Sequence, residues 1–276
     1  MTEKSILITG CSSGIGRDAA LELKRRGWRV FAACRKETDC AAMRDLGLES
    51  PRLDYEDPAT IEAAVSSVLE ATGGTLDALF NNGAYAIPGP VEDIPADAMR
   101  AIFEANLIGW HDLTVRLIPV MRRQGHGRIV NCSSVLGFVH APWRGAYVAT
   151  KFALEGLTAT LRLEMRGTGI EVVLIEPGPI ATEFRSNAIG QFERWVDWKS
   201  SARRTEYEAQ LLDKLYKRGA GDRFEKSASA VTARLIEALE ARHPKPQYFV
   251  TVPTHAAGFL RRILPARLLD RLVRNG

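Results

Sequence analysis

Ser5-Ile-Leu-Ile-Thr-Gly-Cys-Ser-Ser-Gly-Ile-Gly16 is the first stretch of this 276-residue chain with a recognisable strand-to-helix pattern. Its apolar start predicts a buried strand, and a helical pattern runs from about Ile15 to Arg26 and stops at Gly27. Glycines let the backbone approach a pyrophosphate closely, and the free N–H groups at a helix start attract anions. The alternative is a tight turn without a ligand. We predict that the loop holds the phosphates of a dinucleotide through Gly10, Ser12, Ser13, Gly14, Ile15 and Gly16.

Apolar runs alternate with helical patterns along most of the chain. Strands are predicted at residues 5–8, 28–33, 51–54, 76–80, 127–132, 170–175 and 247–252. Helices are predicted at 15–26, 38–46, 57–73, 96–121 (in two pieces, with Asn106 in the middle), 146–167 and 228–241. This order predicts an α/β fold, a single doubly wound Rossmann-type parallel sheet with helices on both faces. We expect one domain over residues 1–254, with an insertion at about 180–226, and a tail over 255–276.

The end of the second strand indicates which dinucleotide is bound. NAD-binding proteins of this fold carry an acidic residue there for the ribose diol, but this chain has Ala33-Cys34-Arg35-Lys36. Arg35 can hold a 2′-phosphate in bidentate fashion, and Arg17 could assist. The alternative is a solvated basic turn. We therefore expect NADP(H) as the cofactor.

Tyr147 and Lys151 lie one turn apart on one face of a predicted helix. An ammonium beside a phenol favours the phenolate, so Lys151 should lower the pKa of Tyr147 from about 10. A tyrosine tuned in this way can give and take a proton near neutral pH. Ser134 lies just after the predicted strand at 127–132 and could hydrogen-bond the same substrate oxygen. These residue types are common in any helix, so the pattern gains weight only from its surroundings.

The chain resembles the short-chain dehydrogenase/reductase family over nearly all of its length, from Ile6 to about Val252. The residues that carry the resemblance are Thr9-Gly10, Gly14 and Gly16, Asp54, Asn81-Asn82-Gly83-Ala84, Asn106, Ser134, Tyr147, Lys151 and Pro177-Gly178. The separation of thirteen residues between Ser134 and Tyr147 is usual in the family. Asn-Asn-Gly-Ala differs from the family's usual Asn-Ala-Gly, which should alter packing more than chemistry.

The resemblance implies a role for each of these residues. Tyr147 is the general acid or base, Lys151 lowers its pKa and binds the nicotinamide ribose, and Ser134 orients the carbonyl. Asn106 holds a water that connects Lys151 to solvent. The remaining expected cofactor contacts are Asp54 at the adenine, Asn82 in the cleft, Pro177, Gly178 and Ile180 on the nicotinamide, and Thr182 on its carboxamide.

Within the family, the chain looks most similar to the retinol dehydrogenase, 17β-hydroxysteroid dehydrogenase and bacterial aldehyde reductase branch. We therefore expect an NADPH-dependent oxidoreductase of a hydrophobic aldehyde, ketone or alcohol, such as a retinoid-, steroid- or fatty-aldehyde-like molecule. The insertion is rich in aromatic residues that either line an apolar pocket or form ordinary core: Phe184, Phe192, Trp195, Trp198, Tyr207 and Tyr216. Arg185 and Arg194 leave a carboxylate or CoA ligand open. The competing class is a non-catalytic NADP-binding regulator or scaffold.

Composition and charge restrict the partners. The four cysteines lack metal-ligand spacing, and we expect no metal and a reduced, cytoplasmic protein. The formal net charge of +4 equals the excess of five arginines over Asp270 in the tail, so the body is nearly neutral and no nucleic-acid partner is expected. No apolar run reaches the ~20 residues of a membrane span. The family implies a homodimer or homotetramer.

The tail carries two apolar stripes separated by Pro265, which predicts two short amphipathic helices. Either both stripes dock on the body or on a partner subunit, or they make a weak peripheral contact with anionic lipid.

Overall fold

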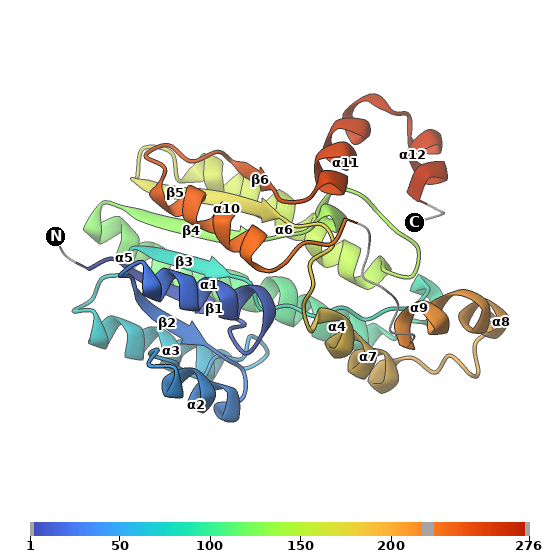
Figure 1. Ribbon diagram of the computed structural model, residues 1–276, viewed down its shortest axis with the longest axis horizontal. Coiled ribbons are helices and arrows are strands. Elements are labelled where there is room, and N and C mark those ends of the chain that lie inside the picture. The colour runs from blue at the N-terminus through green and yellow to red at the C-terminus, as the bar shows by residue number, and fades with distance from the viewer. Residues whose placement is uncertain (1–2, 217–223, 274–276) are drawn as a thin grey trace.

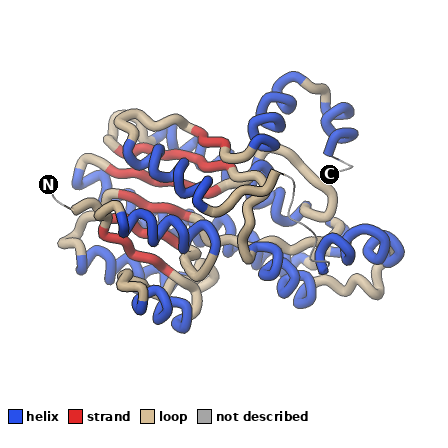
Figure 2. Tube along the Cα trace, viewed as in Figure 1, coloured by secondary structure: helices blue, strands red, loops and turns tan. Residues whose placement is uncertain are grey.

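A single parallel sheet forms the centre of the protein (Figures 1 and 2). The computed structural model describes residues 3–216 and 224–273. Within these ranges the sheet has six strands in the order β2-β1-β3-β4-β5-β6, and every neighbouring pair is parallel. The strands are β1 (Ser5–Thr9), β2 (Arg29–Ala33), β3 (Ala78–Asn81), β4 (Gly127–Cys132), β5 (Ile170–Glu176) and β6 (Gln247–Phe249).

Helices cover both faces of the sheet, as the doubly wound prediction requires. In Figure 1, α1 (Gly14–Arg25) and α10 (Ser229–Glu240) pack together in front of it. On the other face α3 (Pro58–Ala71) packs against α5 (Gly109–Gln124), and α6 (Gly145–Glu164) packs on β5. The strands β1, β3 and β4 are almost wholly buried because helices shield them from both sides.

The predicted strand at residues 51–54 is wrong. The segment runs beside β2 but makes only isolated bridges, Phe31 with Glu49 and Cys34 with Arg52. Pro51 has no N–H to donate, so a regular ladder cannot continue past it. The short helix before this segment, α2, covers Glu37–Asp45 as expected.

The predicted interruption at Asn106 is confirmed. The helix α4 (Ala96–Phe103) passes into η2 (Glu104–Ile108), a π-helical turn, before α5 begins. Asn106 is fully buried inside this turn. A π-helical turn is rare and often lies at a functional site, because it redirects a side chain that a regular helix would present elsewhere.

The insertion forms a helical lobe beside the carboxyl end of the sheet. It contains α7 (Phe184–Trp195), α8 (Arg204–Glu206), η4 (Tyr207–Leu211) and α9 (Leu212–Tyr216). Phe192 and Tyr207 are fully buried in a second apolar cluster that also contains Tyr147. Of the two interpretations of the insertion's aromatic residues, core packing therefore holds for Phe192 and Tyr207, while Tyr216 is exposed.

The tail forms the two helices that its stripes predict, α11 (Val252–Ile263) and α12 (Ala266–Val273), with Pro265 between them. The boundary expected after residue 254 falls inside α11. Figure 1 shows both helices projecting from the body. Among the described residues, no helix is both long and apolar enough to span a membrane.

Candidate active site

The sequence motifs come together at the carboxyl ends of β1, β3, β4 and β5. These strands end at Thr9, Asn81, Cys132 and Glu176, and each is followed directly by a motif segment. Because the strands are parallel and adjacent, the loops that follow them meet at one edge of the sheet. This edge is where doubly wound proteins bind their ligands.

The glycine loop leaves no room for larger residues. Gly10 has a positive φ of 68°, and a Cβ there would lie 2.6 Å from Gly83 Cα. A Cβ on Gly16 would lie 2.4 Å from Gly10 O. Ser13 precedes α1 and makes no side-chain capping bond, so the first N–H groups of the helix are left for another acceptor. The loop is therefore a tight turn whose free N–H groups are suited to hold an anion.

A buried hydrogen-bond network fixes this loop to the next strand. Thr9 Oγ1 accepts a hydrogen bond from Asn82 N at 2.9 Å and lies 2.7 Å from the Tyr55 hydroxyl, within hydrogen-bond distance. The Asn82 Nδ2 group donates to Thr9 O at 3.1 Å. Tyr55 also donates to Asn81 Oδ1 at 2.8 Å. Asn82 thus lies against the glycine loop, where it supports the loop's shape.

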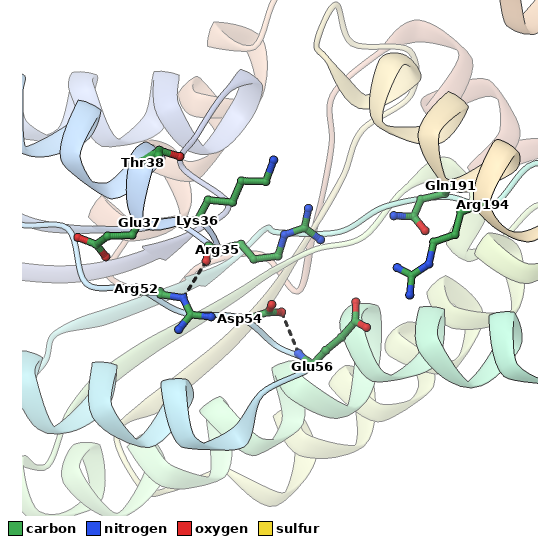
Figure 3. Close-up of a pocket in the computed structure, with 9 residues that line it drawn as sticks. All are labelled: Arg35, Lys36, Glu37, Thr38, Arg52, Asp54, Glu56, Gln191 and Arg194. Atoms are coloured by element: carbon green, nitrogen blue, oxygen red, sulfur yellow. Dashed lines mark hydrogen bonds between the residues drawn. The ribbon is translucent and has the colours of Figure 1, made fainter.

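Arg35 lines a pocket of about 670 Å³ at the end of β2 (Figure 3). The pocket also contains Lys36, Glu37, Thr38, Arg52, Asp54, Glu56, Gln191 and Arg194. Figure 3 shows the Arg35 and Arg194 side chains extending toward each other from opposite sides, with Glu56 between them. Burial raises the pKa of Glu56, the Asp54 carboxylate adds to this rise, and the two arginines oppose it. The pocket has the size and the cations to hold a phosphorylated ribose.

Tyr147 is buried, with 8% of its surface exposed. Its ring meets that of Phe184 edge-on, with 5.4 Å between the centroids, and its hydroxyl lies near the Ser134 side chain. Burial raises the pKa of Tyr147, the Cys132 thiol adds to the rise, and the nearby Ser134 hydroxyl and the charge of Arg144 oppose it. The predicted pair of Tyr147 and Ser134 is thus brought together.

Lys151 lies beneath the Tyr147 ring rather than beside its hydroxyl. The ammonium donates to Cys132 O at 2.8 Å and sits 4.4 Å from the Trp110 ring centroid and 5.7 Å from that of Tyr147. Burial lowers the pKa of Lys151 to about 8. Burial raises the pKa of Tyr147 as well, so desolvation is the largest influence on both groups, and the lowering of the Tyr147 pKa by Lys151 stays a prediction.

Asn106 connects η2 to the helix that carries Tyr147. Its Nδ2 donates to Tyr85 O at 2.8 Å and to Thr150 Oγ1 at 3.3 Å, and its Oδ1 accepts from Tyr85 N at 3.1 Å. These three hydrogen bonds of the buried amide are all to protein groups. The water-holding role implied by the resemblance stays a prediction.

The loop after β5 closes over the glycine loop. Pro177 O accepts from Val135 N at 2.8 Å, which fixes the loop to the segment after Ser134. A Cβ on Gly178 would lie 2.1 Å from Thr251 Oγ1, so only glycine fits there. Thr182 lies close over Gly14, and Ile180 bridges to Lys226.

These residues fit a dinucleotide. The glycine cradle can take the pyrophosphate and the Arg35 pocket the adenosine end, while Ser134, Tyr147 and Lys151 surround the other end of the same edge. Asp54 lines the Arg35 pocket, and its contact with the adenine stays a prediction.

Several residues at this edge were not assigned by sequence reasoning. Tyr55 and Trp110 are buried supports whose partners lie on other strands, and Arg194 enters the cofactor pocket from the insertion. Arg144, three residues before Tyr147, has its pKa lowered by burial and by the nearby Arg185. No local pattern marks these residues, because their neighbours are distant in the chain.

Comparisons with known proteins agree on one family. A sequence model described as short chain dehydrogenase matches residues 4–191. The oxidoreductase YbbO of Escherichia coli K12 is 40% identical over 273 residues, covering 99% of this chain and 95% of YbbO. Mouse retinol dehydrogenase 16 is 33% identical over 99% of this chain and 88% of its own. Human 17-beta-hydroxysteroid dehydrogenase type 1 is 30% identical over 91% of this chain and 78% of its own.

Solved structures share the fold. A short-chain dehydrogenase from Streptomyces avermitilis superposes with a TM-score of 0.79 at 25% identity, over 99% of this chain and 96% of the other. A Burkholderia phymatum short chain dehydrogenase/reductase in complex with NAD gives 0.78 at 26% identity, with the same coverage. An actinorhodin polyketide ketoreductase with NADPH gives 0.72 at 26% identity, over 90% and 95%. By its sequence, its sheet and the residues gathered at the sheet's edge, this protein belongs to the short-chain dehydrogenase family.

Proposed function

We propose that the protein is an NADPH-dependent reductase, or an NADP-dependent dehydrogenase, of a hydrophobic aldehyde, ketone or alcohol. The observation that carries the proposal is the buried Tyr147 side chain, whose hydroxyl lies near Ser134 and whose ring is flanked by that of Phe184. A bound nicotinamide would supply the hydride chemistry. The chain's own residues would then position the carbonyl and move one proton.

Tyr147 is the group suited to that proton. Because burial raises its pKa, the phenol stays protonated at neutral pH and can donate to a carbonyl oxygen during reduction. Ser134 can share the same oxygen and orient it. Lys151, held by Cys132 O, keeps a cation under the Tyr147 ring, where it would favour the phenolate left by proton transfer.

The retinoid-, steroid- or fatty-aldehyde-like substrate class rests on the apolar surroundings of Tyr147. Phe184, Leu136 and Trp143 pack partly buried around the cluster that contains it. The names of the retinol and steroid dehydrogenase relatives agree with an apolar substrate. Arg144 and Arg185 are the nearby cations that would favour a substrate with an added carboxylate.

A spectrophotometric screen tests the activity. NADPH oxidation at neutral pH should be detectable with long-chain aldehydes, retinal and ketosteroids, and weak with short hydrophilic carbonyls. If NADPH binds but no carbonyl of these classes is turned over, the alternative of a non-catalytic NADP-binding regulator is favoured.

NADP(H) is proposed as the cofactor because Arg35, Lys36 and Arg194 converge on one pocket and Cys34 stands where an acidic residue would accept the ribose diol. Among the solved structures of similar proteins, one contains NAD and another contains NADPH. Membership of the family therefore does not set the cofactor preference, and the proposal of NADP(H) rests on the residues of this pocket. The buried thiols of Cys11, Cys34, Cys40 and Cys132 agree with a cytoplasmic, reducing location.

We further propose a homodimer or homotetramer assembled through α5 and α6. Exposed apolar side chains line these helices and η2: Ile108, Val115, Phe152, Leu157 and Leu163. Gly156 lies among them on α6 with open space where a Cβ would be, which permits close helix approach.

Sedimentation velocity tests this assembly. We expect a dimer or tetramer at micromolar concentration, and Gly156→Arg should shift it toward monomer because a large cation replaces the open position. Arg123→Glu, which changes an exposed charge at the far end of α5, is the control and should not change the assembly. A wild-type monomer would contradict the proposal.

The third proposal concerns the tail as a weak, peripheral contact with anionic lipid. The first part of α11 docks on the body of the protein, because Thr254 is buried and Gly258 packs on Phe249. Farther along, Phe259, Ile263, Leu268 and Leu272 are exposed, and no described residue of α12 is buried. The α12 helix is linked to the body through Asp270, which accepts from or pairs with His140 at 2.8 Å.

Exposed arginines accompany this apolar surface: Arg261, Arg262, Arg267 and Arg271. Near an anionic membrane each could add about 1 kcal/mol of attraction. We expect salt-sensitive co-sedimentation with phosphatidylglycerol vesicles and little with phosphatidylcholine. Leu268→Ser with Leu272→Ser keeps every charge and should abolish it, whereas Leu21→Ser on α1 should not. Equal sedimentation of the wild type and the double variant would leave docking on a partner subunit as the role of the tail.

A further inference from the structure

One buried and one partly buried carboxyl group lie behind the catalytic residues. Glu155 lies on α6 one turn after Lys151, and Glu176 is the last residue of β5, directly before Pro177. Glu176 is fully buried, and its Oε1 accepts a hydrogen bond from Gln247 Nε2 of β6 at 2.9 Å. The pair thus joins segments that each carry a residue of the active site.

The remaining oxygen atoms of this cluster face one another. Ser133 Oγ, Glu155 Oε1 and Glu176 Oε2 are shielded from solvent and have no hydrogen-bond partner when both acids are ionised. A Cβ built on Gly137 would lie 2.5 Å from Ser133 Oγ and 2.8 Å from Glu155 Oε1, so these two atoms share one small space. The two carboxyl groups lie close enough that each influences the pKa of the other.

Two ionised carboxylates in such a space would repel each other and leave their oxygens without donors. One proton between them removes both costs, because a carboxylic acid O–H donates to the neighbouring carboxylate. Burial and the facing carboxyl raise the pKa of Glu176, and burial raises that of Glu155.

The cations that act on the pair both come from α6. Lys151 faces Glu155, and Arg162 faces Glu176. β4 and β6 contribute the neutral Ser133 and Gln247, and the Cys132 thiol lies near Lys151 with its pKa raised by burial to about 11. Glu155 in turn raises the pKa of Lys151, after a larger effect from Cys132.

We propose that Glu155 and Glu176 share one proton and act as positioning residues, holding the segments of Ser134, Lys151 and Pro177 together from behind. The single negative charge of the pair resides mainly on Glu155 and supports the ammonium form of Lys151. The kinetic consequence rests on the proposed reductase function, whereas the shared proton does not.

The shared proton predicts a pH dependence of stability. The folded protein keeps a proton that the unfolded chain releases above the ordinary glutamate pKa of about 4.3. The unfolded state therefore binds fewer protons than the folded state between that pH and the raised pKa of the pair, and stability falls as pH rises through this window. Glu176→Gln removes this titration, so the part of the slope that the pair causes should disappear.

Three variants separate the effect of the hydrogen bond within the pair from the effect of the negative charge beside Lys151. In Glu176→Gln the amide can still donate to Glu155, and the charge beside Lys151 is kept. In Glu155→Gln the charge moves to Glu176, away from Lys151. Glu164→Gln, an exposed acid at the end of α6, is the matched control.

Three measurements test the pair. Infrared difference spectra of the wild type at neutral pH should contain the C=O stretch of a buried protonated carboxyl, and Glu176→Gln should lose it. The pH slope of the melting temperature should be smaller in the same variant than in the wild type and unchanged in Glu164→Gln. For NADP-dependent alcohol oxidation, Glu155→Gln should move the pH midpoint of kcat upward by about half a unit or more, because less ammonium supports the phenolate.

Absence of a protonated carboxyl band from the wild type at neutral pH would overturn the shared proton, whatever the variants do. An unchanged kcat profile in a folded, active Glu155→Gln would overturn the link to Lys151. The infrared and melting readouts need no substrate, so a failed carbonyl screen would count against the proposed function alone.

Discussion

Tyr147→Phe should abolish turnover while leaving NADPH binding intact. The substitution removes only the hydroxyl, so the phenyl ring can keep its edge contact with Phe184 and its place above Lys151. Ser134 is a poor acid, and Lys151 is held by Cys132 O beneath the ring. With no other donor positioned at the carbonyl, the loss in kcat should be at least ~10²-fold.

The measurement compares kcat/KM for NADPH oxidation with the Kd of NADPH from fluorescence titration. A loss of kcat with unchanged Kd assigns the hydroxyl to the chemical step. Tyr216→Phe, an exposed tyrosine of the insertion that donates to Glu193, is the control and should behave as the wild type. Activity of Tyr147→Phe within about tenfold of the wild type would remove Tyr147 from its assigned role.

Arg35→Asp should reverse the cofactor preference. The wild type is expected to bind NADPH more tightly than NADH, because Arg35 and Lys36 border the pocket opposite Arg194. The variant removes a charge-assisted contact to the 2′-phosphate and adds repulsion, so NADPH binding should weaken by more than ~2 kcal/mol, or about 30-fold. NADH lacks this phosphate and should lose little.

Dissociation constants of both cofactors for both proteins provide the test. Arg123→Asp makes the same charge change on an exposed residue of α5 and should leave both constants unchanged. Arg194→Gln should weaken NADPH selectively as well, because its guanidinium reaches the same pocket from α7. Equal affinity of the wild type for NADPH and NADH would refute the preference.

Local sequence patterns were sufficient to predict the fold class and to locate the motif residues in the chain. The glycine turn between β1 and α1, the break at Asn106 and the proline between the tail helices all act within a few residues, so their effects can be inferred from neighbours in the chain. The segment at 51–54 shows the limit of such inference. Its composition favours a strand, but only the bridges to β2 reveal how short the pairing is.

The electrostatics of the site depend on contacts between distant segments. The side-by-side spacing of Tyr147 and Lys151 predicts a lowered tyrosine pKa, yet the pKa is raised because α4, α5 and the insertion bury both groups. Spacing along one helix says nothing of how much water the rest of the chain excludes.

Residues from the insertion and from separate strands complete the site without any local signature. Arg194 reaches the Arg35 pocket from α7, about 160 residues farther along the chain, and Glu155 meets Glu176 across the gap between α6 and β5. Local sequence patterns predicted most of the strands and helices and the motif residues at the ends of these elements. The depth of burial of each titratable group, and the partner it meets there, follow from packing between segments far apart in sequence, where desolvation and close charge pairs outweigh any intrinsic preference of the residue.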